Sequence, residues 1–235
     1  MVALGNFLFR YRNALFPLTC VLLFLPGPRL HPDPLVAAAI GAAITLSGQI
    51  VRALTIGLEY IVRGGRQGKV YADGLVIAGI YHHCRNPMYV GNVLIAVGLA
   101  VASNSWSTIF IAVPSVLLAY SAIIAAEERY LAEKFGDAYA DYCRDVPRWF
   151  PRLRGLAKTL GDSRFHWRRL IVKEYGTPAG WIGVLCGVLL YNLWRGGLWD
   201  IRRGEVLAIA WIVAATFALW LLARALKKTR FLQAD

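Results

Sequence analysis

Six apolar stretches recur along the chain, separated by polar or proline-containing segments. They cover residues 15–25, 35–61, 88–103, 108–126, 179–193 and 206–223. A helix needs ~17–25 predominantly apolar residues to cross the hydrocarbon core of a bilayer. The second, fourth and sixth stretches pass this test easily. The other three need flanking residues or tilt, and the first is alternatively re-entrant. The pattern therefore predicts an all-α, polytopic transmembrane bundle of about six helices.

Positive charges are unevenly divided between the two sides that this pattern defines. With a cytoplasmic N-terminus, 21 of the 26 Lys and Arg residues fall in the cytoplasmic segments 1–13, 62–87, 127–178 and 224–235. Four fall on the opposite side, and Arg52 lies within a span. Because Lys and Arg are enriched in cytoplasmic loops, this asymmetry predicts that both termini are cytoplasmic.

Composition supports lipid as the solvent and narrows the partners. The chain is 57% hydrophobic and 17% charged, whereas soluble domains average ~45–50% and ~25%. We interpret the net charge of +12 as loops beside an anionic leaflet rather than a nucleic-acid surface. The four cysteines are widely spaced, so we expect neither a metal site nor a disulfide framework. One membrane domain over residues 1–235 is expected.

The cytoplasmic segment 127–178 has a pattern of its own. Leu131, Phe135, Ala138 and Tyr142 recur at helical spacing, which predicts an amphipathic helix along the interface or folded back onto the bundle. Pro147 would end it. The following basic segment, 153–178, mixes aromatic and cationic residues, as is typical of the headgroup layer. The sequence assigns no role to the two C-terminal spans in 179–223, for which a substrate vestibule and a dimer surface are the options.

The segment 81–92 is the first candidate for chemistry. Asn86 followed by Pro87 is a helix-start pattern, with Asn as the cap, and a helix N-terminus attracts anions. Tyr89 and Asn92 follow at spacings of three, so all three polar side chains can share a face turned toward a cavity rather than lipid. The alternative is a well-capped helix with an interfacial Arg85.

Three further groups carry charge or protons. Glu127 and Glu128 end the fourth span, where carboxylates oppose the helix dipole, so we expect a partner such as Arg129, Arg85 or a ligand. Arg52 lies inside the second span, which marks either a functional site or a structural pair with a carboxylate. His83 is a candidate base, although an interfacial histidine is the alternative.

Several motifs follow one another in a familiar order and spacing. They are Gly79-Ile80-Tyr81, Arg85-Asn86-Pro87-Met88-Tyr89-Val90-Gly91, Glu127-Glu128, Leu131, Phe135-Gly136, Tyr139, Tyr142, Val146-Pro147-Arg148 and Pro151. Together they resemble the integral membrane methyltransferases that include isoprenylcysteine carboxyl methyltransferases and phospholipid N-methyltransferases. The resemblance covers residues 45–152, within an expected core of 35–152. Asn86 stands where the isoprenylcysteine form has His, so the chain looks more like the phospholipid enzymes.

The resemblance implies S-adenosylmethionine as the methyl donor. Its expected cofactor-binding residues are Tyr81, Asn86, Pro87, Tyr89, Gly91, Glu127, Tyr142 and Arg148, with Tyr142, Arg148 and Pro151 closing the site. Arg85, Glu128 and His83 are the catalytic candidates, and Arg52 and Asn92 the substrate-binding ones. No metal ligand is expected.

The expected acceptor is a membrane lipid or another lipidic molecule, first the amine headgroup of a phospholipid. The alternatives are a carboxyl or thiol group on a prenylcysteine-like or small hydrophobic substrate, or a non-enzymatic transporter or scaffold. The expected location is the bacterial inner membrane, with the active site facing the cytoplasm.

Overall fold

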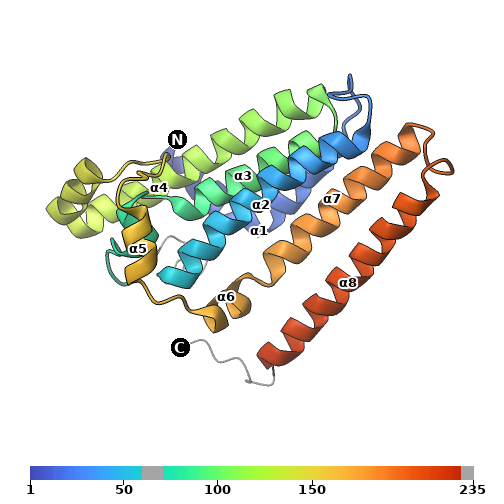
Figure 1. Ribbon diagram of the computed structural model, residues 1–235. Coiled ribbons are helices and arrows are strands. Elements are labelled where there is room, and N and C mark those ends of the chain that lie inside the picture. Colours follow the sequence, from blue (N-terminus) through green and yellow to red (C-terminus); the bar gives the residue numbers. More distant parts are fainter. Residues whose placement is uncertain (60–70, 229–235) are drawn as a thin grey trace.

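The computed structural model describes residues 1–59 and 71–228, and in this part every regular element is helical (Figure 1). The elements are α1 (Val2–Thr19), η1 (Cys20–Phe24), α2 (Pro34–Leu58), η2 (Gly79–His82), α3 (Pro87–Ala102), α4 (Trp106–Asp145), α5 (Leu156–Asp162), α6 (Trp167–Glu174), α7 (Gly176–Arg195) and α8 (Arg203–Lys228). The long helices run roughly side by side, and the short α5 and α6 lie at one end of the bundle (Figure 1). The predicted all-helical membrane fold is confirmed.

Glycines allow α2 and α3 to pack closely at the centre of the bundle. A Cβ atom on Gly48 would lie 2.6 Å from the carbonyl oxygen of Gly91, closer than real contacts allow. Gly41 and Gly98 meet in the same way one to two turns further along. In a membrane, where lipid is as apolar as the side chains, such small residues let helices approach and gain van der Waals contact.

The N-terminal segment is helical, whereas the sequence pattern predicted a cytoplasmic lead-in over residues 1–13. Helix α1 starts at Val2 and packs along α4, with Gly5 against the backbone of Ala122 and Phe9 buried. The chain bends by 90° between Val2–Arg12 and Pro17–Phe24. Pro17 lacks the N–H that a continuous helix needs. The predicted first span is thus a broken span or a re-entrant segment.

Helix α4 is 40 residues long and bends near its end. Gly136 has φ 50° and ψ −125°, a conformation that costs other residues steric strain. The predicted amphipathic helix is therefore a continuation of α4. Beyond the bend Tyr139 is buried and Ala138 is exposed, contrary to the predicted face, because the non-helical residue shifts the helical register.

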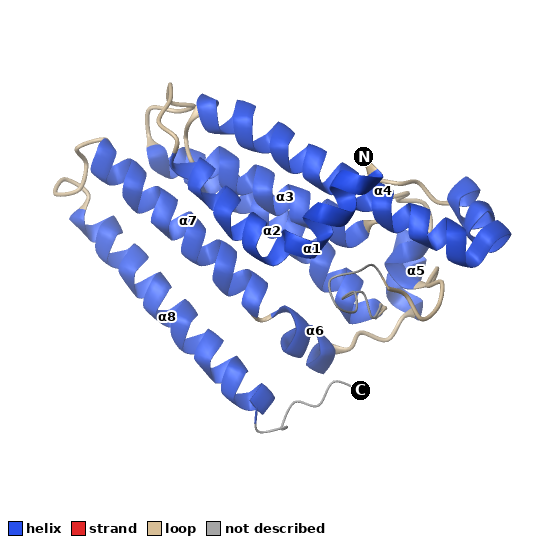
Figure 2. Ribbon diagram, turned by 180° about the vertical axis from the view of Figure 1, so that it is seen from behind, coloured by secondary structure: helices blue, strands red, loops and turns tan. Residues whose placement is uncertain are grey.

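The two additional helices flank the core. Helix α7 packs on α2 and α3, and α8 contacts only α7 and α6 among the pairs with substantial contact. Figure 2 shows α8 at the edge of the bundle. Its exposed apolar side chains, such as Trp211 and Phe217, suit lipid contact. At the opposite end from α6, Asp33 caps α2. The Leu35 N–H and the Arg202 guanidinium both lower the pKa of Asp33.

About six spans are predicted from the sequence. Within residues 1–59 and 71–228, four helices are long and apolar enough to cross a membrane, namely α2, α4, α7 and α8, and the bent α1–η1 pair would make a fifth. Helix α3 is apolar but has only 16 residues, below the ~17 residues that a span needs. The start of α1 and the end of α8 lie at the same end of the bundle (Figure 1), which is compatible with the predicted topology.

Candidate functional site

The start of α3 and the carboxylates of α4 meet at one end of the bundle. Tyr89 Oη donates to Glu127 Oε1 at 2.6 Å. Asn86 Nδ2 donates to Glu128 Oε1 at 3.3 Å. Arg85 and Arg148 form ion pairs with Glu128 at 3.3 and 2.8 Å. We call these six residues the carboxylate cluster. The partners expected for the two glutamates thus come from two segments. One is 85–89, about 40 residues earlier, and the other, with Arg148, follows α4.

Asn86 does not cap α3 as predicted. It occupies the N-cap position, but its side chain makes no capping hydrogen bond. Its amide is directed to Glu128 and to the carbonyl oxygen of Arg148 instead. The competing carboxylate explains the difference, because a charged acceptor forms the stronger hydrogen bond. The Asn86 side chain therefore satisfies none of the first backbone N–H groups of α3, although its carbonyl oxygen accepts from the Tyr89 and Val90 N–H groups. A helix N-terminus without a side-chain cap suits an anion.

The segment after α4 folds back along the residues before α3. Arg85 N donates to Pro147 O, and Arg152 N donates to His83 O, both at 2.9 Å. Tyr142 Oη donates to the carbonyl oxygen of Tyr81 at 2.7 Å. These contacts cover the carboxylate cluster from one side. Of the residues that the resemblance assigned to closing the site, Tyr142, Arg148 and Pro151, Tyr142 makes this hydrogen bond and Arg148 pairs with Glu128.

Two buried guanidinium nitrogens at the cluster have no hydrogen-bond partner in the described part of the chain. They are the Nε atoms of Arg85 and Arg148. Burial by itself lowers the pKa of Arg85, but the neighbouring Glu128 carboxylate raises it, and the net shift is upward. Arg85 therefore stays cationic. Unsatisfied donors of two cations beside an uncapped helix N-terminus fit the carboxylate of a methionyl group.

A small cavity of about 20 Å³ adjoins the cluster. Its lining residues are Ala72, Gly74, Leu75, Val76, Arg85, Asn86, Leu131, Tyr139 and Tyr142. Sites for molecules of cofactor size usually enclose ~300–1,000 Å³. The cavity is therefore smaller than a nucleoside-containing molecule in this conformation of the protein.

His83 lies beside the cluster but is bound on both ring nitrogens. Its Nδ1 is 2.8 Å from the carbonyl oxygen of Arg152, and its Nε2 is 2.9 Å from Thr159 Oγ1. A carbonyl oxygen can only accept, so Nδ1 carries a proton and donates to Arg152 O, while the Thr159 hydroxyl is able to accept from Nε2 or donate to it. This geometry favours a structural role, holding α5 and the 147–152 segment, over the predicted role of base.

Three other predicted cofactor residues differ in how they face the cluster. Pro87 is the buried first residue of α3, as expected. Tyr81 is 2% exposed and presents its backbone carbonyl to Tyr142 rather than its ring to the cavity. Gly91 lies against α2, where a Cβ atom would be 2.8 Å from the Gly48 carbonyl oxygen. Close helix packing accounts for the glycine at position 91.

The predicted substrate residues Arg52 and Asn92 are neighbours at a second place. Arg52 forms a two-point ion pair with Glu174, with Nε–Oε1 at 2.5 Å and Nη2–Oε2 at 2.8 Å. Its Nη1 also donates to Asn92 Oδ1. Gln49 donates to Glu174 and accepts from Trp181, which links α2, α6 and α7. Both predicted residues line a cavity of about 890 Å³.

Sequence reasoning missed Glu174, the carboxylate that compensates Arg52. It is the only acidic residue between Asp162 and Asp200 and follows a run of basic residues. This isolated acidic position indicated a possible ionic partner for Arg52. It also missed Tyr139 and Cys143 as neighbours of Arg85, whose Nη1 is 2.8 Å from Cys143 Sγ. These contacts depend on the bend at Gly136, which leaves no pattern in the sequence beyond the glycine itself.

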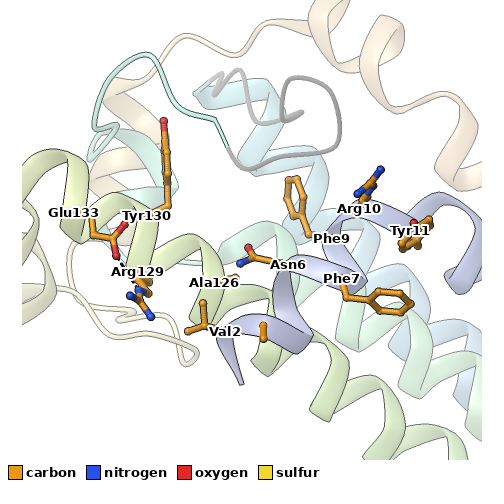
Figure 3. Close-up of a pocket in the computed structure, with 11 residues that line it drawn as sticks. Val2, Asn6, Phe7, Phe9, Arg10, Tyr11, Ala126, Arg129, Tyr130 and Glu133 are labelled. Atoms are coloured by element: carbon orange, nitrogen blue, oxygen red, sulfur yellow. Dashed lines mark hydrogen bonds and ion pairs between the residues drawn. The ribbon is translucent and has the colours of Figure 1, made fainter.

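A further hollow of about 810 Å³ lies between α1 and the end of α4 (Figure 3). Asn6, Phe7, Phe9 and Tyr130 line it, along with the ion pair of Arg129 and Glu133. None of the predicted site residues is among its lining residues. Within the described residues, no group of three or more His, Cys, Asp or Glu side chains is placed to hold a metal ion.

Comparisons with known proteins place this geometry in a family. Residues 36–138 match the phospholipid methyltransferase family model. The cobalt-zinc-cadmium resistance protein CzcN of Cupriavidus metallidurans is 32% identical over 160 residues, which cover 64% of this chain and 68% of the relative. The nickel-cobalt-cadmium resistance protein NccN of Alcaligenes xylosoxydans xylosoxydans is 38% identical over 79 residues, or 34% of this chain and 37% of the relative.

A yeast enzyme is also similar. The protein-S-isoprenylcysteine O-methyltransferase of Schizosaccharomyces pombe is 34% identical over 77 residues, which cover 33% of each chain. No solved structure gives a significant match. The matched segments contain the start of α3 and both carboxylates of α4 within the family-model range. The chain therefore belongs to the integral membrane methyltransferase family that includes the phospholipid and isoprenylcysteine methyltransferases.

Proposed function

We propose that the protein transfers a methyl group from S-adenosylmethionine to a membrane-partitioned acceptor, with the amine headgroup of a phospholipid as the first acceptor class. One observation carries the proposal. The Asn86–Pro87 helix start and the Glu127–Glu128 pair are in direct contact in a chain of this family. The expected location of the protein is the bacterial inner membrane. The asymmetry of Lys and Arg favours a carboxylate cluster on the cytoplasmic side.

The residues of the cluster have separate tasks in this proposal. Arg85 and Arg148, with the uncapped start of α3, would bind the donor's carboxylate. Glu128 holds both guanidinium groups in place through its ion pairs. Glu127, which accepts from Tyr89, would contact a hydroxyl or ammonium group of the donor. The cofactor would supply a methyl group bonded to a sulfonium sulfur. The carbon of that methyl group is electrophilic without further activation.

The transfer itself requires alignment more than covalent participation. The lone pair of the acceptor atom forms the new bond to the methyl carbon, and the electron pair of the carbon–sulfur bond remains on sulfur. Holding the two reactants in line and excluding water lowers the barrier. An amine acceptor must also release a proton. Glu128, Glu127 and His83 are the candidate bases, and His83 holds Arg152 and Thr159 with its two ring nitrogens. A carboxylate or thiolate acceptor needs no base.

The test is donor binding by the full-length protein in lipid nanodiscs, measured by calorimetry. Glu128→Gln removes the charge that orders Arg85 and Arg148, so we expect S-adenosylmethionine to bind roughly tenfold or more weakly, the loss of one charge-assisted contact. Glu133→Gln is the matched control, because Glu133 is an exposed glutamate on the same helix with its own partner, Arg129. It should bind like the wild type.

Two results would count against the proposal. If the folded wild type binds no donor with or without added lipid, the chain does not carry out this reaction, and a transporter or scaffold role becomes the better account. If Glu128→Gln and Glu133→Gln bind equally well, the donor site lies away from the carboxylate cluster. A labelled donor, incubated with lipid extracts and the wild type, then identifies the acceptor.

A further inference from the structure

The cavity of about 890 Å³ lies between the family core and the additional C-terminal helices. Arg12 and Pro17 of the α1 helix, together with residues of α2, α3 and α4, line one side of it. Lys173 of α6, Thr177 of α7, and Trp220 and Lys227 of α8 line the other. Its volume is within the ~300–1,000 Å³ range of ligand sites, enough for a lipid headgroup and the start of its chains.

The lining of this cavity is cationic. Arg12, Arg52, Lys173 and Lys227 contribute side chains to it, and no carboxylate does among the described residues. Glu174, behind the lining, compensates Arg52. A concave site that gathers charges of one sign between low-dielectric walls raises the local concentration of oppositely charged ligands. The charge therefore favours a ligand with an anionic group.

The rest of the lining is apolar or aromatic. Met88, Ile123 and Val172 supply aliphatic surface, and Tyr120 and Trp220 supply rings. Helix α8, which forms the outer wall, is mostly exposed along its length, so in a bilayer it borders lipid. Apolar walls would add nothing to the binding of a small soluble anion. An amphiphile can place its polar end among the cations and its chains along the apolar side.

One side chain joins this cavity to the carboxylate cluster. Tyr89 lines the cavity and donates to Glu127, and Met88 next to it lies in the first turn of α3. A ligand held by the cationic lining is thus next to the place where the donor is expected. The Arg52–Glu174 pair, with Gln49 and Trp181, fixes α6 and α7 to α2 and keeps the outer wall in position.

We infer that this cavity is the acceptor site, and that the acceptor is an anionic amphiphile whose phosphate or carboxylate is bound by the cationic lining. The inference rests on the proposed function and assigns a role to the C-terminal helices. A phospholipid with an amine headgroup meets the requirement through its phosphate, and a fatty carboxylate meets it directly.

The experiment compares two adjacent lysines in the full-length protein. Lys227 lines the cavity and Lys228, its exposed neighbour, does not. Binding of four probes is measured in detergent: dioleoyl phosphatidylethanolamine, oleate, dioleoylglycerol and inorganic phosphate. We expect the wild type and Lys228→Gln to bind dioleoyl phosphatidylethanolamine, oleate or both with equal affinity. Lys227→Gln should bind them roughly tenfold more weakly, as for one lost charge-assisted contact.

Each alternative result has a defined meaning. Phospholipid binding without oleate binding identifies a phosphate site, and the reverse identifies a carboxylate site; both support the inference. Dioleoylglycerol binding as tightly as the phospholipid would overturn the anionic requirement. Inorganic phosphate binding as tightly would overturn the requirement for an amphiphile. Equal losses in Lys227→Gln and Lys228→Gln would overturn the location.

Donor binding is measured on the same samples, so that the two proposals fail separately. If the protein binds the donor but shows no lipid binding that Lys227→Gln weakens, the proposed acceptor site is wrong and the proposed function is not contradicted. Lipid binding that depends on Lys227, in a protein that binds no donor, would establish the anionic amphiphile site and remove the methyl transfer.

Discussion

Glu174 is 3% exposed, and its two carboxylate oxygens receive Nε and Nη2 of Arg52. Both side chains are largely buried, with exposed fractions of 12% for Arg52 and 4% for Glu174. A buried ion pair contributes little net stability, because desolvating the two charges offsets their attraction. Removing one member is costly, since the other charge is left uncompensated. The pair therefore fixes where α6 and α7 dock on α2 more than it stabilises the fold.

At this scale we predict that Glu174→Ala lowers stability by roughly 3–5 kcal/mol, the usual cost of an uncompensated buried charge. The double variant Arg52→Met/Glu174→Leu removes both charges and should recover most of that loss. Chemical denaturation in a fixed detergent measures both. Glu133→Ala, which changes an exposed glutamate, is the control. A single variant no less stable than the double would show that Arg52 finds another partner or water.

The close contact of α2 and α3 is the main packing feature among the elements. Gly41 and Gly48 of α2 face Gly98 and Gly91 of α3, so the backbones approach closely between Gly91 and Ala102. This contact sets the position of α3 and with it the height of Asn86 and Tyr89 relative to the carboxylates of α4. A shift of one helix against the other would separate the two halves of the site.

For this element pair we predict that Gly48→Val is destabilising by at least ~1–3 kcal/mol, the cost of overpacking, and that it weakens donor binding. Its Cβ atom would lie 2.6 Å from the Gly91 carbonyl oxygen, which belongs to backbone and cannot turn away. Gly183→Val in α7 is the matched control, because nothing lies within 4 Å of a Cβ atom there. Similar unfolding midpoints for the two variants would contradict the packing argument.

In the whole molecule, the carboxylate cluster, α6 and the end of α8 all lie at one end of the bundle (Figure 1). The turns around Asp33, Asn104 and Gly197 belong to the opposite end, where Asp33 pairs with Arg202. Both proposed binding sites are therefore reached from the same side of the membrane. The distribution of Lys and Arg predicts that this side is cytoplasmic.

The topology prediction concerns two exposed positions at opposite ends. Leu153 is 75% exposed and Ile201 is 79% exposed. In intact bacterial cells, a membrane-impermeant maleimide should label Ile201→Cys, and it should label Leu153→Cys only after the cells are permeabilised. The parent protein, with its four own cysteines, gives the background. Labelling of Leu153→Cys in intact cells, without labelling of Ile201→Cys, would reverse the orientation.

The sequence alone determined the membrane class, five of the apolar helices to within a few residues at most ends, and the helix start at Pro87. It also made Glu127 and Glu128 candidate site residues. These features depend on local composition and periodicity, which act over a turn or two of helix. The motif order also indicated that the Asn86 segment and the glutamates belong to one site, and the structure brings them into contact.

Only the tertiary structure decided which residue is the ionic partner of each buried charge and which helices enclose a cavity. The partner of Arg52 comes from 122 residues away, the side chain of Asn86 prefers Glu128 to its own helix, and the bend at Gly136 exchanges Ala138 for Tyr139 in the core. The cationic cavity exists only because α6, α7 and α8 pack beside the core. Such contacts depend on the free energy of the whole assembled bundle, which local sequence pattern does not contain.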